Sequence, residues 1–252
     1  MKIKAALFDL DGTLLPMDQD AFTKGYFKLL AKKLLPHGYE PDALVKAIWH
    51  GTVAMVKNDG SCTNEEAFWN DFFATYGPDA KQDLPVFNEF YAVEFQQAKD
   101  LCGFTPDAAA TVRFLQKTGL RVVLATNPIF PAVATESRIR WAGLRPEDFE
   151  LYTTYENIGY CKPNLDYYRE ILHRLELSAE ECIMVGNDVR EDMVAEQLGM
   201  EVFLLTDCVI NPDNLPTQQW PHGDFAALKD YLKEHLEVYQ FEKDFDNKSP
   251  RK

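Results

Sequence analysis

A short apolar run that ends in two closely spaced carboxylates constrains this 252-residue chain more than any other stretch. Residues 5–8 read Ala-Ala-Leu-Phe, long enough for one buried strand, and Asp9, Asp11 and Gly12 come directly after. An ionised carboxylate at the end of a buried strand is costly unless a cation or hydrogen bonds compensate it. If the strand continues to Asp11, both carboxylates point to the same side, where they favour a divalent cation or a shared proton. The alternative is a strand followed by an acidic turn.

Composition limits the classes of protein to which the chain can belong. With 46% hydrophobic and 26% charged residues it resembles a globular protein of one or two domains. A net charge of −14 argues against a nucleic-acid partner, because the phosphate backbone needs positive charge. Five scattered cysteines without a Cys-x-x-Cys pair indicate free thiols, so we expect a cytoplasmic protein. We expect no membrane partner and no secretory signal, since no apolar run approaches the length of a membrane span.

The segment from residue 18 to 104 has the pattern of helices and no strand. Apolar residues recur at helical spacing over 18–36, and Pro41 can open a second helix. Thr63 and Glu66 form a capping-box signature at the start of a third helix, and residues 87–98 suggest a fourth.

From residue 105 onward, helices and strands alternate along the chain. Strands are predicted at 120–125, 149–154, 182–185 and 201–205, and helices at 106–119, 131–141, 163–177, 190–198 and 224–236. This alternation, together with the N-terminal strand, predicts an α/β fold with a doubly wound parallel sheet, similar to a Rossmann fold. Residues 1–15 and 105–240 would then form the core, residues 16–104 an all-helical insertion after the first strand, and residues 241–252 a polar C-terminal tail.

Polar side chains follow the ends of three predicted strands. Ligand sites in open α/β sheets form beyond the carboxyl ends of the strands. Asp9 and Asp11 follow the first strand, and the other two strands and the loop between them supply Thr126, Asn127, Lys162, Asn187, Asp188 and Asp192. Lys162 stands just before a predicted helix and could present its ammonium group to an anion. Taken alone, each residue has a simpler explanation: Thr126 as a loop cap, Lys162 as a surface lysine, and the acids as helix N-terminal residues.

These stretches, in this order, resemble the four motifs of the haloacid dehalogenase-like (HAD) phosphohydrolase superfamily. The first motif is the string Asp-x-Asp-Gly-Thr-Leu at residues 9–14, and the resemblance covers residues 3–15 and 105–206. It implies a HAD core with a type 1 helical cap at residues 16–104, which would close over the core. Substrate choice would then come mainly from cap side chains, for which the candidates are Lys24, Lys28, Trp49 and His50.

The resemblance also implies a role for each motif residue. Asp9 is similar to the nucleophile that takes the phosphoryl group, and Asp11 to the general acid/base whose backbone carbonyl binds Mg²⁺. Thr126 resembles the hydroxyl residue that binds phosphoryl oxygens, with Asn127 beside it, and Lys162 resembles the lysine that neutralises the nucleophile and the phosphate. Asp9 and Asp188 would be carboxylate ligands of the metal, and Asp192 would support its water shell. The family often has an acid at the position of Asn187, so the ligand could lie one residue earlier than Asp188.

The function implied is a magnesium-dependent phosphatase that hydrolyses a small-molecule phosphate monoester through an aspartyl-phosphate. Asp11 favours this over dehalogenation, because dehalogenases of the superfamily lack an acid there. A phosphoglucomutase-like phosphoryl transfer stays open, since it uses the same acids. The non-enzymatic alternative is a receiver-like regulatory protein, although receivers carry their phosphorylated Asp on the third strand and are about half this length. The oligomeric state, monomer or dimer, is left open.

Overall fold

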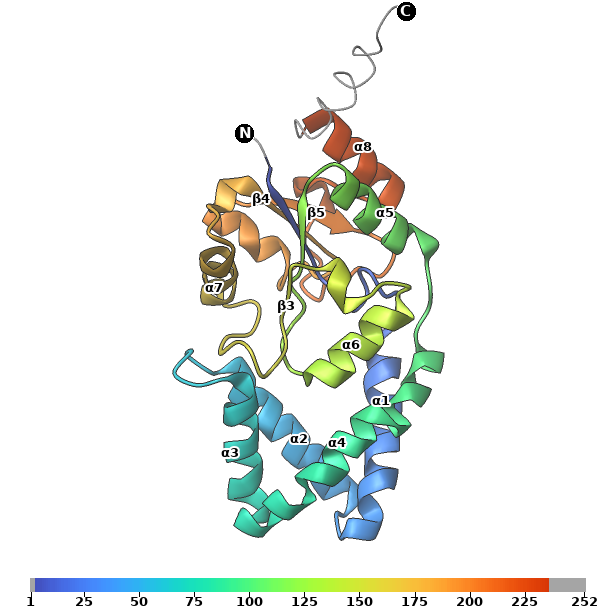
Figure 1. Ribbon diagram of the computed structural model, residues 1–252, viewed down its shortest axis with the longest axis vertical. Helices are drawn as coiled ribbons and strands as arrows, with labels where there is room; N and C mark the ends of the chain where they lie inside the picture. Colours follow the sequence, from blue (N-terminus) through green and yellow to red (C-terminus); the bar gives the residue numbers. More distant parts are fainter. Residues whose placement is uncertain (1–2, 236–252) are drawn as a thin grey trace, which may run out of the picture.

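A six-stranded parallel sheet forms the centre of the fold in the computed structural model, which describes residues 3–235 (Figure 1). The strand order is β3-β2-β1-β4-β5-β6. The strands are β1 (Ala5–Phe8), β2 (Arg121–Leu124), β3 (Leu151–Tyr152), β4 (Cys182–Gly186), β5 (Glu201–Leu205) and β6 (His222–Gly223). In the register of β1 with its two neighbours, Phe8 lies opposite Leu124 and Val185. The predicted doubly wound α/β fold is confirmed.

Successive side chains of a strand point to opposite faces of the sheet, and both faces carry apolar side chains. Helices therefore cover both faces. Ala6 and Phe8 belong to one buried cluster, whereas Ala5 and Leu7 belong to the other. The first cluster is covered by α5 (Pro106–Lys117), α6 (Ala132–Trp141) and α8 (Phe225–His235), and the second by α7 (Leu165–Leu175) and the 3₁₀ helix η6 (Met193–Leu198). Figure 1 shows α7 on one side of the sheet and α5 and α8 on the other.

The segment of residues 19–101, between β1 and α5, is helical, as predicted, and lies beyond one end of the sheet (Figure 1). The described residues of this segment form α1 (Gln19–Leu34), η1 (Leu35–His37), α2 (Pro41–Val56), α3 (Asn64–Tyr76), η2 (Pro78–Asp83), α4 (Leu84–Ala92) and η3 (Glu94–Leu101). Pro41 opens α2, and Thr63 and Glu66 form the predicted capping box of α3. Aromatic rings fill the space between these helices, with the fully buried Phe72 stacked on Phe68.

The two chain crossings that connect this helical segment to the sheet lie side by side. Met17 and Cys102 form an isolated antiparallel bridge, and the Gly103 N–H donates to the Pro16 carbonyl at 2.7 Å. The chain therefore leaves the sheet and returns to it at nearly the same place.

Several elements differ from the sequence prediction. The fourth helix breaks at Val93, whose ψ of −73° departs from the helical value, into α4 and η3. The helix predicted at 190–198 is only the 3₁₀ helix η6, because the preceding residues form the loop that closes around Asp188. The strand predicted at 149–154 shrinks to β3, and β6 was not predicted, since two residues carry too little pattern.

Three further short 3₁₀ helices are η4 (Pro146–Asp148), η5 (Ala179–Glu181) and η7 (Thr217–Gln219). Residues 3–235 contain no helix with the length and apolar character needed to cross a bilayer. The tail predicted at 241–252 and the end of the last helix, predicted near residue 236, lie outside the described residues.

Candidate active site

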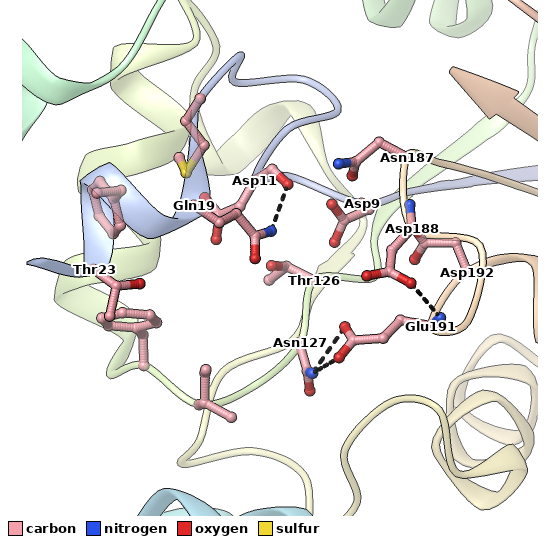
Figure 2. A pocket seen from close by; sticks show the side chains of 14 residues that line it. Asp9, Asp11, Gln19, Thr23, Thr126, Asn127, Asn187, Asp188, Glu191 and Asp192 are labelled. Carbon is pink, nitrogen blue, oxygen red and sulfur yellow. Dashed lines mark hydrogen bonds between the residues drawn. The ribbon is translucent and has the colours of Figure 1, made fainter. Parts of the chain in front are cut away.

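The strand order places a crevice at the carboxyl ends of β1 and β4. The chain passes from β1 to β2 and β3 on one side of the sheet, and continues through β4, β5 and β6 on the other. Such a reversal of winding direction opens a space between neighbouring loops, where ligands bind in folds of this class. Asp9 follows β1, and Asp188 lies two residues after β4. Figure 2 shows these two side chains facing one hollow, which we call the acidic hollow.

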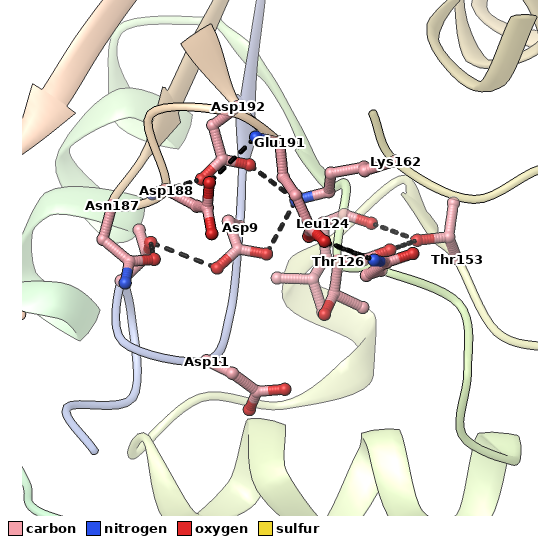
Figure 3. Close-up of polar contacts among 12 residues, drawn as sticks. Asp9, Asp11, Leu124, Thr126, Thr153, Lys162, Asn187, Asp188, Glu191 and Asp192 are labelled. Carbon is pink, nitrogen blue, oxygen red and sulfur yellow. Dashed lines mark hydrogen bonds and ion pairs between the residues drawn. The ribbon is translucent and has the colours of Figure 1, made fainter. Parts of the chain in front are cut away.

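The acidic hollow gathers most of the residues singled out in the sequence. Seven of them line it: Asp9, Asp11, Thr126, Asn127, Asn187, Asp188 and Asp192. Lys162 reaches it from behind through its contact with Asp9 (Figure 3). Residues as far apart in the sequence as Asp9 and Asp192 therefore meet, because each follows a strand end or precedes a helix on the same edge of the sheet.

Asp9 is held in one orientation by contacts at both carboxylate oxygens. Its Oδ1 accepts a hydrogen bond from the Lys162 ammonium at 2.8 Å, and its Oδ2 accepts one from the Thr13 hydroxyl at 3.2 Å. Its backbone N–H donates to the Val185 carbonyl at 2.9 Å, which continues the pairing of β1 with β4. Asp9 is 7% exposed, enough to face the hollow. It is a fixed carboxylate with access to a bound ligand.

Lys162 forms a buried ionic bridge between two acids. Its ammonium donates to Asp9 at 2.8 Å and to Asp192 at 2.7 Å, and its side chain is 1% exposed. Burial alone would lower the pKa of Lys162, but the carboxylates of Asp192 and Asp9 outweigh it and raise that pKa well above its usual value. The lysine therefore stays charged beside Asp9, where it neutralises negative charge.

Asp11 faces the same hollow, but its carboxylate is bound elsewhere. Figure 3 shows its side chain apart from the cluster around Asp9 and Lys162, directed toward α6. There it forms an ion pair with Arg138, a fully buried residue of α6. Burial raises the pKa of Asp11 above its usual value, although the Arg138 charge opposes the shift. Its Oδ1 is buried with no hydrogen-bond partner among the described residues.

In the loop after β4, Asp188 brings a carboxylate to the hollow, and Asn187 lines the hollow beside it with an amide. The Asp188 Oδ1 accepts the N–H groups of Arg190 and Glu191 at 2.7 and 2.9 Å, which fixes the side chain. Asn187 is used in support: its Oδ1 accepts from Thr13 at 2.8 Å, and its Nδ2 donates to the Cys208 carbonyl at 2.7 Å. Asn187 thereby connects this loop to the residue that orients Asp9.

Gly12 permits the close approach of the loops after β1 and β4. A Cβ at this position would lie 2.3 Å from the Asn187 Nδ2, and the φ of +88° also favours glycine. A side chain here would displace the Asn187 amide from its contacts.

Three residues of the site were not predicted from the sequence: Thr13, Arg138 and Glu191. Glu191 lines the hollow, and each of its two carboxylate oxygens accepts a hydrogen bond from the Asn127 Nδ2 at 3.0 Å. Burial raises the pKa of Glu191 to about 8. Thr13 belongs to the first motif at residues 9–14, and Glu191 lies between Asp188 and Asp192. Their positions in the sequence could therefore have indicated that they belong to the site. A single arginine within a helix gives no such indication.

The donors at the hollow suit a hard divalent cation. Asp9, Asp188 and the Asp11 carbonyl supply oxygen atoms, the ligands that Mg²⁺ prefers. Among the described residues, no three His, Cys, Asp or Glu side chains are grouped closely enough to hold a metal by themselves. Mg²⁺ usually keeps several waters and takes further oxygens from its substrate, so two carboxylates and a carbonyl are donors of the kind that it uses.

A parallel sheet with an acidic crevice at its switch point and a helical segment inserted after the first strand defines a doubly wound α/β protein with a ligand site of this kind. Comparison with known families identifies the family: the profile of the haloacid dehalogenase-like hydrolases matches residues 3–199. The chain belongs to this family.

Individual relatives are distant. Hexitol phosphatase A of Escherichia coli is 28% identical over 190 residues, covering 73% of this chain and 74% of that protein. A glyceraldehyde 3-phosphate phosphatase of Methanothermobacter thermautotrophicus is 25% identical, covering 81% and 85%. Among solved structures, the HAD-hydrolase YfnB of Bacillus subtilis, bound to magnesium, superposes with a TM-score of 0.53 at 19% identity, covering 94% of this chain and all of that one. At that identity the structural likeness supports the fold alone.

Proposed function

We propose that this chain is a magnesium-dependent phosphatase that hydrolyses a small phosphate monoester through an aspartyl-phosphate on Asp9. The observation that carries the proposal is the position of Asp9 after β1, oriented by Thr13 and neutralised by Lys162, with a second carboxyl, Asp11, in the same hollow. Support also comes from the family and from the two relatives, both of which are phosphatases of small phosphate esters.

In the first step, an Asp9 carboxylate oxygen attacks phosphorus and the bond from phosphorus to the ester oxygen breaks. Asp11 gives its proton to the departing alkoxide oxygen, and its raised pKa suits a general acid. The Lys162 ammonium and the Thr126 side chain, with Asn127 beside it, neutralise or bind the phosphoryl oxygens. Phosphoryl transfer needs positioning and charge neutralisation of this kind more than covalent activation.

In the second step, water attacks the phosphorus of the aspartyl-phosphate. Asp11, now a carboxylate, takes a proton from that water, and the bond from phosphorus to the Asp9 oxygen breaks. Inorganic phosphate leaves, and both acids return to their starting protonation states. A carboxylate nucleophile thus divides one difficult displacement into two easier ones.

Asp9, Asp188 and the Asp11 carbonyl would hold the Mg²⁺, and Asp192 would support its water shell. When bound, the ion supplies charge neutralisation for the phosphoryl group. Asp192 also fixes its neighbours, since its carboxylate accepts hydrogen bonds from the Asp188 N–H at 3.0 Å and from the Lys162 ammonium.

We also propose the domain division expected from the sequence, with residues 1–15 and 105–240 as catalytic core and 16–104 as cap. The adjacent crossings at Pro16 and Gly103 support these boundaries. A cap attached through two neighbouring crossings can move as a unit and exclude water from the site.

The test is release of inorganic phosphate from a panel of small phosphate monoesters, with Mg²⁺ and with EDTA. We expect turnover that EDTA abolishes and Mg²⁺ restores, and none from Asp9→Asn. Full activity in metal-free buffer would contradict the metal assignment. A stable phosphoprotein without steady phosphate release would favour the regulatory alternative, and transfer between two positions of a sugar phosphate would favour a mutase.

A further inference from the structure

A second hollow lies beside the acidic hollow, between the helical segment and the loops that follow β2 and β3. We call it the aromatic hollow. Among the described residues, fourteen line it: nine are aromatic and none is charged. The rings come from α1, α2, α3 and α4 on one side, and from Phe130 and Tyr155 on the other. Of the four cap candidates named from the sequence, Trp49 alone lines it, and that residue is 50% exposed.

The two hollows are neighbours, since Thr23, Ile129 and Phe130 line both. Phe130 is fixed at this boundary. The Arg138 guanidinium lies over its ring, 4.3 Å from the centroid, and the Tyr26 ring meets it edge-on at 5.4 Å. The same arginine pairs with Asp11, so one side chain contacts both the proposed general acid and Phe130 at the boundary of the aromatic hollow.

Three of the hydroxyl groups that line the aromatic hollow already have partners, although Thr23 and Tyr155 also bring hydroxyls to it. The Tyr26 and Tyr91 hydroxyls bond each other at 2.9 Å, and the Thr52 hydroxyl donates to the Ile48 carbonyl at 2.9 Å. Burial raises the pKa of Tyr26 to about 12, so its hydroxyl stays neutral. A polyol placed here would bury several hydroxyls with few partners, which is unfavourable. An aromatic ring would instead contact ring edges and faces like those that already pair, such as Phe27 with Trp49.

We propose that the aromatic hollow binds the alcohol part of the substrate, and that this alcohol is aromatic or otherwise apolar. The inference rests on the proposed phosphatase function, because it places the phosphate in the acidic hollow and the leaving group across the boundary at Phe130. Burial of one ring in such a site is worth about ten- to a hundredfold in kcat/KM over an ester that leaves the hollow empty.

The test compares 2-phenylethyl phosphate with glycerol 1-phosphate, two primary alkyl esters that differ in the character of the alcohol. We expect the wild type to hydrolyse the phenylethyl ester with at least about tenfold higher kcat/KM. Thr52→Phe fills the hollow and should remove that advantage while the rate on acetyl phosphate, which is too small to reach the hollow, is kept. Thr75→Phe is the matched control, since Thr75 also donates its hydroxyl to the carbonyl four residues earlier, but is exposed on α3. It should retain the advantage.

A binding measurement separates this inference from the proposed function. Trp49 and Trp69 line the aromatic hollow, so 2-phenylethanol alone should quench tryptophan fluorescence saturably in the wild type and in Thr75→Phe. The quenching should weaken at least about tenfold in Thr52→Phe, and in Thr52→Leu if the larger residue disturbs folding. Phosphate release from no ester, with the binding intact, would overturn the phosphatase and keep the site. Equal rates on the two alkyl esters, or binding unchanged in the filled variants, would overturn the site.

Discussion

The Arg138 guanidinium pairs with the Asp11 carboxylate, whereas the Asp9 carboxylate pairs with Lys162. Arg138 is fully buried, and it also contacts the Ala134 carbonyl and the Thr135 hydroxyl within α6. Burial raises the pKa of Asp11, and the arginine opposes that rise. Arg138 therefore limits the rise in the pKa of the proposed general acid.

Replacing Arg138 should shift the pH profile of the first step upward. In Arg138→Met the opposing charge is lost, so the pKa of Asp11 rises further and the acid stays protonated to higher pH. Transfer from an alkyl phosphate to Asp9 needs protonated Asp11, so the pH midpoint of its decline should move to higher values. Single-turnover rates measured across pH test this. Arg138→Lys keeps a charge and should shift the midpoint less. An unchanged midpoint in Arg138→Met would show that the Arg138 charge does not set the pKa of Asp11.

Asp9 and Asp11 should fail in different ways when each is changed to asparagine. Asp9→Asn removes the nucleophile and should leave every ester unhydrolysed. Asp11→Asn removes only the proton donor and acceptor, a loss of about 10²–10⁴-fold. In a single-turnover burst, that loss should be larger for an alkyl phosphate than for p-nitrophenyl phosphate, because p-nitrophenol leaves without protonation. Equal losses for both leaving groups, or turnover by Asp9→Asn, would refute these roles.

The Lys162 bridge should matter for stability as well as for catalysis. Lys162→Met leaves the carboxylates of Asp9 and Asp192 buried without their cation, which typically lowers the free energy of unfolding by about 3–5 kcal/mol. Adding Asp192→Asn should restore part of that stability, but no activity. Urea unfolding measures the stability of the single and the double variant, and phosphate release measures their activity. Lys233→Met, which breaks the exposed pair with Asp230, is the control and should change the free energy by less than about 0.5 kcal/mol.

The sequence predicted those parts of the site in which a polar residue interrupts an apolar strand pattern. Asp9, Thr126 and Asp188 follow strands whose β-branched and apolar runs are visible in one dimension, and the doubly wound order brings the ends of those strands together. Lys162 required the resemblance, because a lysine before a helix is ordinarily on the surface. Here two acids compensate its burial.

Other features depend on contacts that local patterns do not encode. Arg138 lies in a helix of ordinary composition, and its burial follows from Asp11, 127 positions earlier in the chain. The contacts of Asn187 depend on Thr13 and Cys208, which lie far from it in the sequence and occupy its amide group. The aromatic hollow forms because four helices leave space among their rings, and helical spacing alone indicates packing rather than a cavity.

Glu191 should make the metal-free protein less stable as the pH rises. Its pKa is about 8 in the folded state, against about 4.3 in an unfolded chain, because burial penalises the charged form. The folded state therefore holds the proton more tightly, and this contribution to stability is complete below about pH 4 and is lost as the pH rises through about 8. Glu191→Gln stays neutral, and its amide can accept from the Asn127 Nδ2 and donate to the Asn127 Oδ1, which has no partner among the described residues.

In EDTA, the melting temperature of Glu191→Gln should exceed that of the wild type at pH 9 by more than about 2 °C, the shift that ~1 kcal/mol gives in a chain of this size. The difference should shrink steadily toward pH 5, because the wild-type glutamate then becomes protonated in the folded state. Glu234→Gln, at an exposed position of α8, controls for the loss of one negative charge from an acidic protein. A difference that is the same at pH 5 and pH 9, or that grows toward pH 5, would show that Glu191 is ionised in the folded protein at neutral pH.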